Sequence, residues 1–169
     1  HYVASTEDLL QMYTSGTTGR PKGTVLTHNN VGENIHQCSP TLNMERGDQF
    51  LIVAPMYHAA AGFCTFLTVS RGGCLHILED FNPMEVVRVL SEENIASTLL
   101  VPAMIQACLV AVPDVAERRY DNLRSLVYGG SPIAEGTLRR AMEVFKCDFI
   151  QVFGMTELSP VATFLTPDD

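Results

Sequence analysis

The sequence lacks the features that define several large classes of protein. Its five cysteines are widely spaced and include no Cys-x-x-Cys pair, so we expect reduced, buried thiols of a cytoplasmic protein rather than disulfides or zinc ligands. Basic residues are too few to balance the acids, and the net charge of -8 argues against nucleic acid or an anionic membrane as a partner. The longest apolar stretch, residues 99–112, is interrupted by Pro102 and Gln106 and is too short to span a bilayer.

Repeats, low-complexity tracts and evident linkers are also missing. With 169 residues and 46% hydrophobic content, residues 1–169 are predicted to form one domain with its own core. The chain opens on His1 and Tyr2 without an initiator methionine, and it shows no basic-then-apolar leader. We expect it to be part of something longer.

Short apolar segments alternate with helical patterns along the chain. This alternation predicts an α/β fold with a mainly parallel sheet flanked by helices. Asn82 before Pro83 is an N-cap signal for one helix, Ser131 with Pro132 is expected to open another, and an apolar stripe from Met104 to Val112 predicts a third. The expected strands are residues 9–14, 50–54, 74–78, 97–101, 125–128 and 149–153.

Residues 13–23 concentrate small hydroxyl side chains, glycines and a lysine in one loop, Tyr-Thr-Ser-Gly-Thr-Thr-Gly-Arg-Pro-Lys-Gly. Glycines let backbone N–H groups approach a ligand, hydroxyls add donors, and the ammonium of Lys22 supplies a point charge, so the loop suits a polyphosphate. The apolar run at residues 9–13 predicts a buried strand, which would place the loop at a strand's carboxyl end, where α/β sheets bind ligands. A flexible linker is the simpler alternative, but a linker does not usually end in Pro-Lys-Gly.

The loop departs from the common P-loop, because Pro21 rather than glycine precedes Lys22, and no Gly-x-Gly-x-x-Gly occurs in the chain. Two later segments fit a ligand site at the same edge. Residues 151–157, Gln-Val-Phe-Gly-Met-Thr-Glu, follow an apolar run and would deliver a hydroxyl and a carboxylate suited to phosphate and a hard divalent ion. Residues 128–132, Tyr-Gly-Gly-Ser-Pro, form a predicted strand-to-helix turn that could also bind the ligand. The structural alternative for residues 151–157 is a helix cap, and the alternative for residues 128–132 is a plain tight turn.

The three segments together resemble the adenylate-forming superfamily of acyl-CoA synthetases, aryl-CoA ligases, luciferases and the adenylation domains of peptide synthetases. The resemblance implies a flavodoxin-like subdomain that binds ATP and AMP, with Mg²⁺ held by Thr14 and Glu157. It also implies catalytic roles for Lys22, His58, Thr156 and Glu157. The nucleotide-binding residues that it implies are Thr14, Ser15, Gly16, Thr17, Thr18, Gly19, Lys22, Gly129, Gly130, Ser131, Gln151, Val152, Phe153, Gly154 and Thr156.

Within this resemblance Phe153 would stack on adenine and Thr156 would contact the α-phosphate. The sequence departs from the family at Val152, where a glycine or another small residue is usual, and at Phe153, where tyrosine is more common. Stacking survives the loss of a phenolic hydroxyl, whereas a hydrogen bond from that hydroxyl would not.

The segment at residues 57–63, Tyr-His-Ala-Ala-Ala-Gly-Phe, bears on the substrate. A lone histidine is more often structural, but His58 matches the family's position at the acyl pocket. Amino-acid adenylation domains place an aspartate in this region, and the segment contains no acid. The resemblance therefore favours a fatty-acid–CoA ligase that forms acyl-AMP and transfers the acyl group to coenzyme A. A ligase for aryl acids of the coumarate or ferulate type is the alternative.

Complete enzymes of the superfamily also have an upstream portion, a ribose-binding aspartate, a hinge and a small C-terminal domain with a catalytic lysine. The chain ends at Asp169 without these parts. We therefore expect a fragment of the large N-terminal domain that is inactive by itself, with a non-catalytic module of weak nucleotide affinity as the second hypothesis.

Overall fold

The structure is a computed structural model that describes residues 2–15, 19–42 and 44–169. Its centre is a six-stranded sheet in the order β4-β3-β5-β6-β7-β8, in which every neighbouring pair is parallel except β7 and β8. The predicted α/β class with a mainly parallel sheet is confirmed. The strands are β3 (Gln49–Ile52), β4 (Cys74–Ile77), β5 (Ile95–Leu100), β6 (Ser125–Gly129), β7 (Asp148–Gly154) and β8 (Val161–Leu165).

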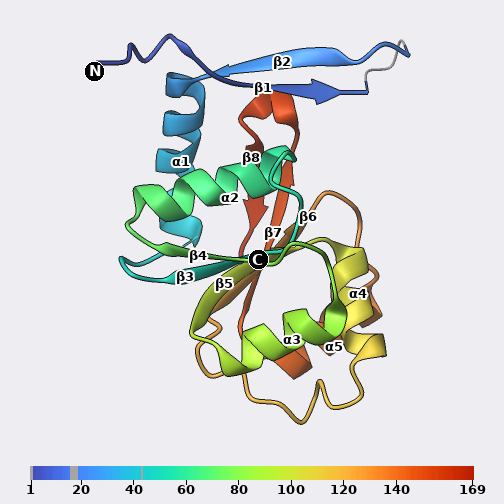
Figure 1. Cartoon of the computed structure of the whole chain (residues 1–169). Coiled ribbons are helices and arrows are strands. Elements are labelled where there is room, and N and C mark those ends of the chain that lie inside the picture. Colours follow the sequence, from blue (N-terminus) through green and yellow to red (C-terminus); the bar gives the residue numbers. More distant parts are fainter. Residues whose placement is uncertain (1, 16–18, 43) are drawn as a thin grey trace.

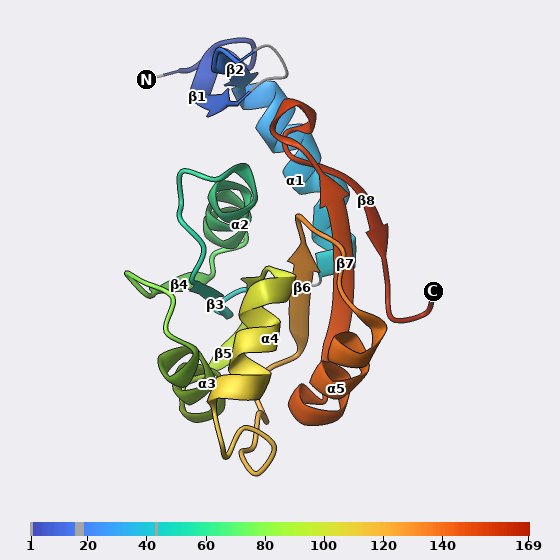
Figure 2. The same cartoon turned by 90° about the vertical axis from the view of Figure 1, so that its right-hand side faces the viewer.

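Helices cover both faces of the sheet, because alternate residues of each buried strand point to opposite sides. On one face Leu51, Leu100 and Leu126 pack with α3 (Pro83–Glu92), α4 (Pro102–Ala111) and α5 (Glu135–Phe145). On the other face Phe50, Leu99 and Val127 pack with α1 (His28–Leu42) and α2 (Ala59–Ser70). Figure 2 shows the two groups of helices on either side of the sheet.

The order of the strands changes direction between β3 and β5. From β3 the chain passes through α2 on one face to β4, and from β5 it passes through α4 on the other face to β6. The connections that follow β3 and β5 therefore diverge and leave a crevice at their carboxyl ends. In open α/β sheets this switch point is where ligands bind.

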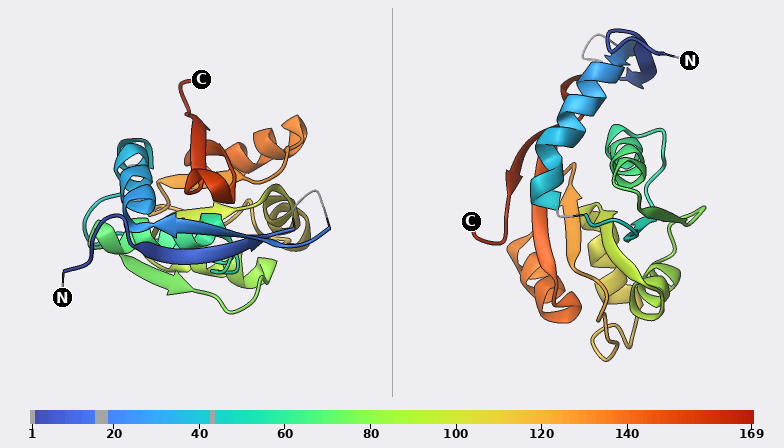
Figure 3. Two further views of the ribbon diagram at one scale, coloured as in Figure 1. Left: turned by 90° about the horizontal axis from the view of Figure 1, so that it is seen from above. Right: turned by 90° about the vertical axis from the view of Figure 1, so that its left-hand side faces the viewer.

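The segment predicted as a buried strand at residues 9–14 does not belong to this sheet. It forms β1 (Asp8–Thr14), whose one partner among the described residues is β2 (Lys22–Thr27), and these two antiparallel strands make a separate hairpin. Figures 1 and 3 show the hairpin lying across one end of the molecule. The prediction was wrong because residues along β1 alternate between half-buried and exposed, as in a strand with one solvated face.

Three further expectations can be compared with the structure. Asn82 caps α3 as predicted, since its side chain accepts hydrogen bonds from the backbone N–H groups of Met84 and Glu85. Ser131 does not open α5, because the helix begins at Glu135 and its N-cap is Ala134. Cys74 is exposed, although all the thiols were expected to be buried.

Among the described residues no helix combines the length and apolar character that crossing a membrane requires.

Candidate nucleotide and acyl site

A cavity of about 460 Å³ lies at the carboxyl edge of the sheet. Its walls come from the residues that follow four parallel strands: Pro55 and His58 after β3, Val101 after β5, Gly130 after β6, and residues 152–156 at the end of β7. This is the switch-point crevice described above. The segments at residues 128–132 and 151–157 thus meet at one edge, as predicted, and residues 55–58 lie at the same edge.

Small and apolar side chains form much of the wall. Ala59, Ala60 and Ala61 come from the first turn of α2, and Leu99 and Met104 come from β5 and α4. None of the described residues that line the cavity is Asp, Glu, Lys or Arg. A neutral, largely apolar group fits this wall, because a buried charge would have no partner there.

Two rings lie at the cavity. Phe153, near the carboxyl end of β7, is 63% exposed, which is a large exposure for a phenylalanine within a strand. His58 is exposed as the N-cap of α2, and its ring centroid is 4.9 Å from that of Tyr57. An exposed aromatic face beside a cavity can stack on a flat ligand ring.

Gly129 and Gly130 form the turn at the end of β6. A Cβ at Gly129 would overlap the carbonyl oxygen and the Cγ2 atom of Val152 in β7, so this position needs glycine for a close strand approach. Gly130 has φ of +80°, which L side chains rarely adopt, and it lines the cavity. Ser131 is exposed beyond the turn and does not line the cavity.

Beyond β7 the chain makes a tight loop that we call the Thr156 turn, residues 155–160, which contains the 3-10 helix η1 (Thr156–Leu158). The N–H of Met155 donates to the carbonyl oxygen of Pro160 at 2.9 Å, and the N–H of Ser159 donates to that of Thr156 at 3.2 Å. Thr156 is half-buried and lines the cavity, whereas Glu157 is exposed and does not line it. The turn therefore divides its hydroxyl and its carboxylate between the cavity and the surface.

The hairpin carries the residues predicted to hold the outer phosphates. Thr14 at the end of β1 is directly opposite Lys22 at the start of β2, and both Ser15 and Lys22 are exposed. Gly19 has φ of +77°. These residues do not line the cavity, but β2 contacts η1, so the hairpin lies against the Thr156 turn. The predicted Gly16, Thr17 and Thr18 lie outside the described residues.

Among the remaining predicted residues, Gln151 in β7 interacts with Tyr128 in the neighbouring strand β6. The hydroxyl of Tyr128 lies 3.5 Å from the Oε1 atom of Gln151, and burial raises the pKa of the Tyr128 phenol. The structure thus brings six of the predicted residues to one cavity: His58, Gly130, Val152, Phe153, Gly154 and Thr156.

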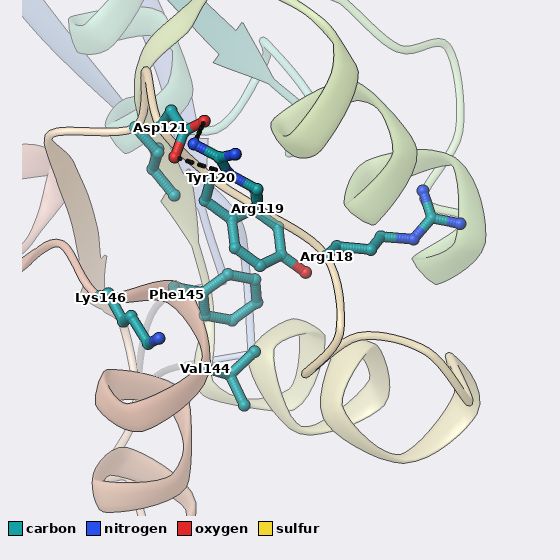
Figure 4. Close-up of a pocket in the computed structure, with 8 residues that line it drawn as sticks. Arg118, Arg119, Tyr120, Asp121, Val144, Phe145 and Lys146 are labelled. Carbon is teal, nitrogen blue, oxygen red and sulfur yellow. Dashed lines mark hydrogen bonds and ion pairs between the residues drawn. The ribbon is translucent and has the colours of Figure 1, made fainter.

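A second cavity, of about 300 Å³, lies between α5 and the connection that precedes β6, and it is lined in part by Arg118, Arg119 and Lys146 (Figure 4). Its arginines are already paired. Arg118 bonds with Asp114 and Glu92, and Arg119 bonds with Asp121. The two arginines therefore offer a ligand little unbalanced charge.

Sequence reasoning missed one buried polar residue beside the site. Asn34 in α1 hydrogen-bonds with Val161, directly after the Thr156 turn. Its signal was available, because an asparagine at a core-facing helical position, between Val31 and Cys38, needs a specific partner.

The chain is similar to proteins of known family along its whole length. The AMP-binding enzyme family model matches residues 4–169. The chain is 36% identical to the medium/long-chain-fatty-acid–CoA ligase FadD8 of Mycobacterium tuberculosis, over 93% of this chain and 27% of that protein. It is 35% identical to a feruloyl-CoA synthase of an Amycolatopsis species, over 89% of this chain and 30% of that protein.

Solved structures give the same result. The inhibitor-bound N-terminal domain of FACL13 from Mycobacterium tuberculosis superposes with a TM-score of 0.90 at 30% identity, covering 97% of this chain and 41% of that one. The o-succinylbenzoate coenzyme A synthetase of Bacillus subtilis, solved with ATP and magnesium, gives 0.82 at 26% identity, covering 94% and 32%. The chain belongs to the AMP-binding enzyme family and spans about a third or less of the length of the two relatives.

Proposed function

We propose that this chain is the central nucleotide-binding segment of an acyl-CoA synthetase that activates a carboxylic acid with ATP and passes it to coenzyme A. The observation that carries the proposal is the cavity, where small apolar side chains adjoin Thr156 and an exposed Phe153 at the sheet's switch point. The wall of small apolar side chains suits an uncharged acyl tail, and the part beside Phe153 and Thr156 suits a nucleotide. Membership of the AMP-binding enzyme family supports the assignment.

The reaction begins with attack of the substrate carboxylate on the α-phosphorus of ATP. A new phosphorus–oxygen bond forms, the bond to the bridging oxygen breaks, and pyrophosphate leaves. Because both reactants are anions, the protein must position them and balance their charge. In this proposal Thr156 contacts the α-phosphate, His58 lies beside the substrate carboxylate, and Lys22 with the hairpin loop holds the outer phosphates.

Mg²⁺ would be held by the hydroxyl of Thr14 and the carboxylate of Glu157, which are hard oxygen donors of the kind this ion prefers. Within the described residues no group of three or more His, Cys, Asp or Glu side chains could hold a metal. Phosphate oxygens and water would therefore supply the other ligands, as is usual for Mg²⁺. When bound, the ion would neutralise charge on the phosphates. In the second half-reaction the thiol of coenzyme A would attack the acyl carbon and release AMP.

We propose a fatty acid as the substrate, since the wall formed by Ala59, Ala60 and Ala61 carries no charge. An aryl acid is the second candidate, because the similarity to the feruloyl-CoA synthase nearly equals that to the fatty-acid–CoA ligase. ATP–pyrophosphate exchange by the full-length enzyme, measured with fatty acids and with cinnamate-type acids, tests both. Exchange with neither class would refute the proposal.

The change Glu157→Gln tests the site itself. We expect roughly a 100-fold loss of exchange, with an unchanged midpoint of thermal unfolding because Glu157 is exposed. Glu117→Gln, an exposed glutamate in the connection before β6, is the matched control and should exchange at the wild-type rate. A wild-type rate in Glu157→Gln would remove Glu157 from the site.

The isolated 169-residue chain is proposed to be inactive, since the complete reaction is expected to need parts beyond it. Incubation of the chain with ATP, Mg²⁺ and a fatty acid should release no pyrophosphate above background. Robust release would show that these residues are sufficient for adenylation.

A further inference from the structure

The side chain of Asn34 is buried, at 7% exposure, and it bonds both backbone polar groups of one distant residue. Its Nδ2 donates to the carbonyl oxygen of Val161 at 2.9 Å, and the N–H of Val161 donates to its Oδ1 at 3.2 Å. The carboxamide thus serves Val161 as a neighbouring strand's peptide group would. A buried amide with both sides satisfied fixes the relative position of the two elements that it joins.

Val161 is the first residue of β8 and directly follows the Thr156 turn. It pairs with Gly154 across β7 and β8, on the other side of the turn. Within the turn the N–H of Leu158 donates to the carbonyl oxygen of Met155 at 2.9 Å, in addition to the bonds that close it. Because the turn is braced internally, a shift of Val161 would carry Thr156 and Glu157 with it.

The N-terminal end of α1, six residues before Asn34, is joined to the hairpin. α1 begins at His28, immediately after β2 ends at Thr27. Thr27 and Asn30 cap the helix reciprocally, each side chain accepting from the other's backbone N–H at 3.2 Å. Figure 2 shows α1 running from the hairpin along the side of β7 and β8. α1 therefore connects the two parts of the proposed phosphate site, the hairpin and the Thr156 turn.

We propose that Asn34 is a positioning residue that holds the Thr156 turn in register with the hairpin that carries Lys22. This inference rests on the proposed function. Asn34 does not line the cavity, and its side-chain hydrogen bonds go to the backbone of Val161 rather than to Ala59, Ala60 or Ala61, which are assigned to the acyl tail. Its loss should therefore impair the use of MgATP while leaving the acid's KM unchanged.

The change Asn34→Asp gives a test that depends on pH. The ionised carboxylate can still accept from the N–H of Val161, but its second oxygen faces the carbonyl oxygen of Val161 and repels it. The protonated carboxyl restores a donor there and reproduces the amide's two hydrogen bonds. Burial and the facing carbonyl raise the pKa of such a carboxyl, so protonation falls within a usable pH range.

The measurement is kcat/KM for MgATP in pyrophosphate exchange, expressed as the ratio of variant to full-length wild type at each pH. We expect a loss of about 10- to 100-fold at pH 8 that shrinks steadily toward pH 5.5, with the KM for the acid unchanged throughout. Asn29→Asp is the matched control, because Asn29 is exposed on the same helix; its ratio should stay near one. A ratio for Asn34→Asp that does not change with pH would overturn the proposal.

Asn34→Ala provides a second readout that needs no activity. The backbone N–H of Val161 loses its acceptor and should exchange with solvent faster than in the wild type, while amides in β5 keep their protection. An unchanged exchange rate of the Val161 amide would overturn the proposal that Asn34 holds Val161 in place. An equal loss of protection across all amides would indicate a purely structural role for Asn34. If the wild-type enzyme shows no pyrophosphate exchange, the proposed function fails. The hydrogen-exchange rate of the Val161 amide still decides whether Asn34 holds Val161 in place.

Discussion

The change Gly129→Ala adds a single methyl group at the point where β6 approaches β7. Gly129 is opposite Val152 in the parallel ladder, and a Cβ there would overlap the carbonyl oxygen of Val152 as well as its Cγ2 atom. The Val152 side chain can rotate, but its carbonyl oxygen belongs to the backbone of β7. Relief therefore requires the two strands to separate at their carboxyl ends.

The size of the effect follows from two opposing terms. Forcing a methyl group into a closely packed position costs about 1–3 kcal/mol, and the backbone obstacle places Gly129 at the upper end of that range. Replacing glycine reduces the entropy of the unfolded chain and returns about 0.5–1 kcal/mol. We expect Gly129→Ala to lower the free energy of unfolding by about 2 kcal/mol, the balance of these terms.

Gly136→Ala is the matched control. Gly136 lies in α5, and a Cβ there would meet nothing within 4 Å, so the same change should raise the free energy of unfolding by about 0.5–1 kcal/mol. Urea unfolding followed by circular dichroism at 222 nm measures both variants, with equal m-values as the check on a common transition. A Gly129→Ala protein as stable as Gly136→Ala would refute the close approach of β6 and β7.

Two further predictions concern the rest of the molecule. Burial opposes ionisation of Asp48, but hydrogen bonds from Arg124 and the backbone of Glu45 lower its pKa below 3.8 overall; the pair therefore stabilises the fold above pH 4 and loses this effect as the pH falls through the lowered pKa. Asp48→Asn should cost roughly 0.5–1 kcal/mol at pH 7 in urea unfolding, and this cost should shrink as the pH falls below 4; a cost that stays the same from pH 7 to pH 2 would contradict this origin. In thiol titration with Ellman's reagent only Cys74 should react quickly, and Cys74→Ser should abolish that phase; a second fast thiol would show that the core is open. The other thiols are shielded, because burial raises the pKa of Cys38 to about 11 and those of Cys64, Cys108 and Cys147 to about 12.

The parallel strands could be predicted from the sequence because they are buried on both faces. In a strand such as β5 every residue is buried, and four of its six residues are apolar, which is typical of a strand covered on both faces. β3 to β7 were located to within two residues at each end, and Asn82 was identified as a cap from its neighbour Pro83. The meeting of residues 128–132 and 151–157 could be predicted for the same reason, because parallel strands end at the same edge.

Two of the elements that were missed, α1 and β8, have weaker patterns. The buried stripe of α1 runs through Val31, Asn34, Cys38 and Leu42, and the asparagine interrupts the apolar repeat by which helices are found. β8 pairs only with β7, at the edge of the sheet, and most of its residues are exposed. The two elements are joined at this position, since Asn34 hydrogen-bonds the first residue of β8. The position that obscured the helix is the one that connects it to the site.

Because the hairpin lies outside the central sheet, substitutions that change its charge can be distinguished from substitutions that change its position relative to the cavity. The cavity lies at the strand ends of the sheet, whereas the hairpin that carries Lys22 and Thr14 is joined to that edge through the contacts of β2 with η1 and through α1. Packing of Met12 against Gly62 of α2 adds a third connection, because a Cβ at Gly62 would lie 3.3 Å from the Met12 methyl group. On the proposed function, changes at Lys22 would alter the charge offered to the phosphates, and changes at Asn34 or Gly62 would alter where that charge is held.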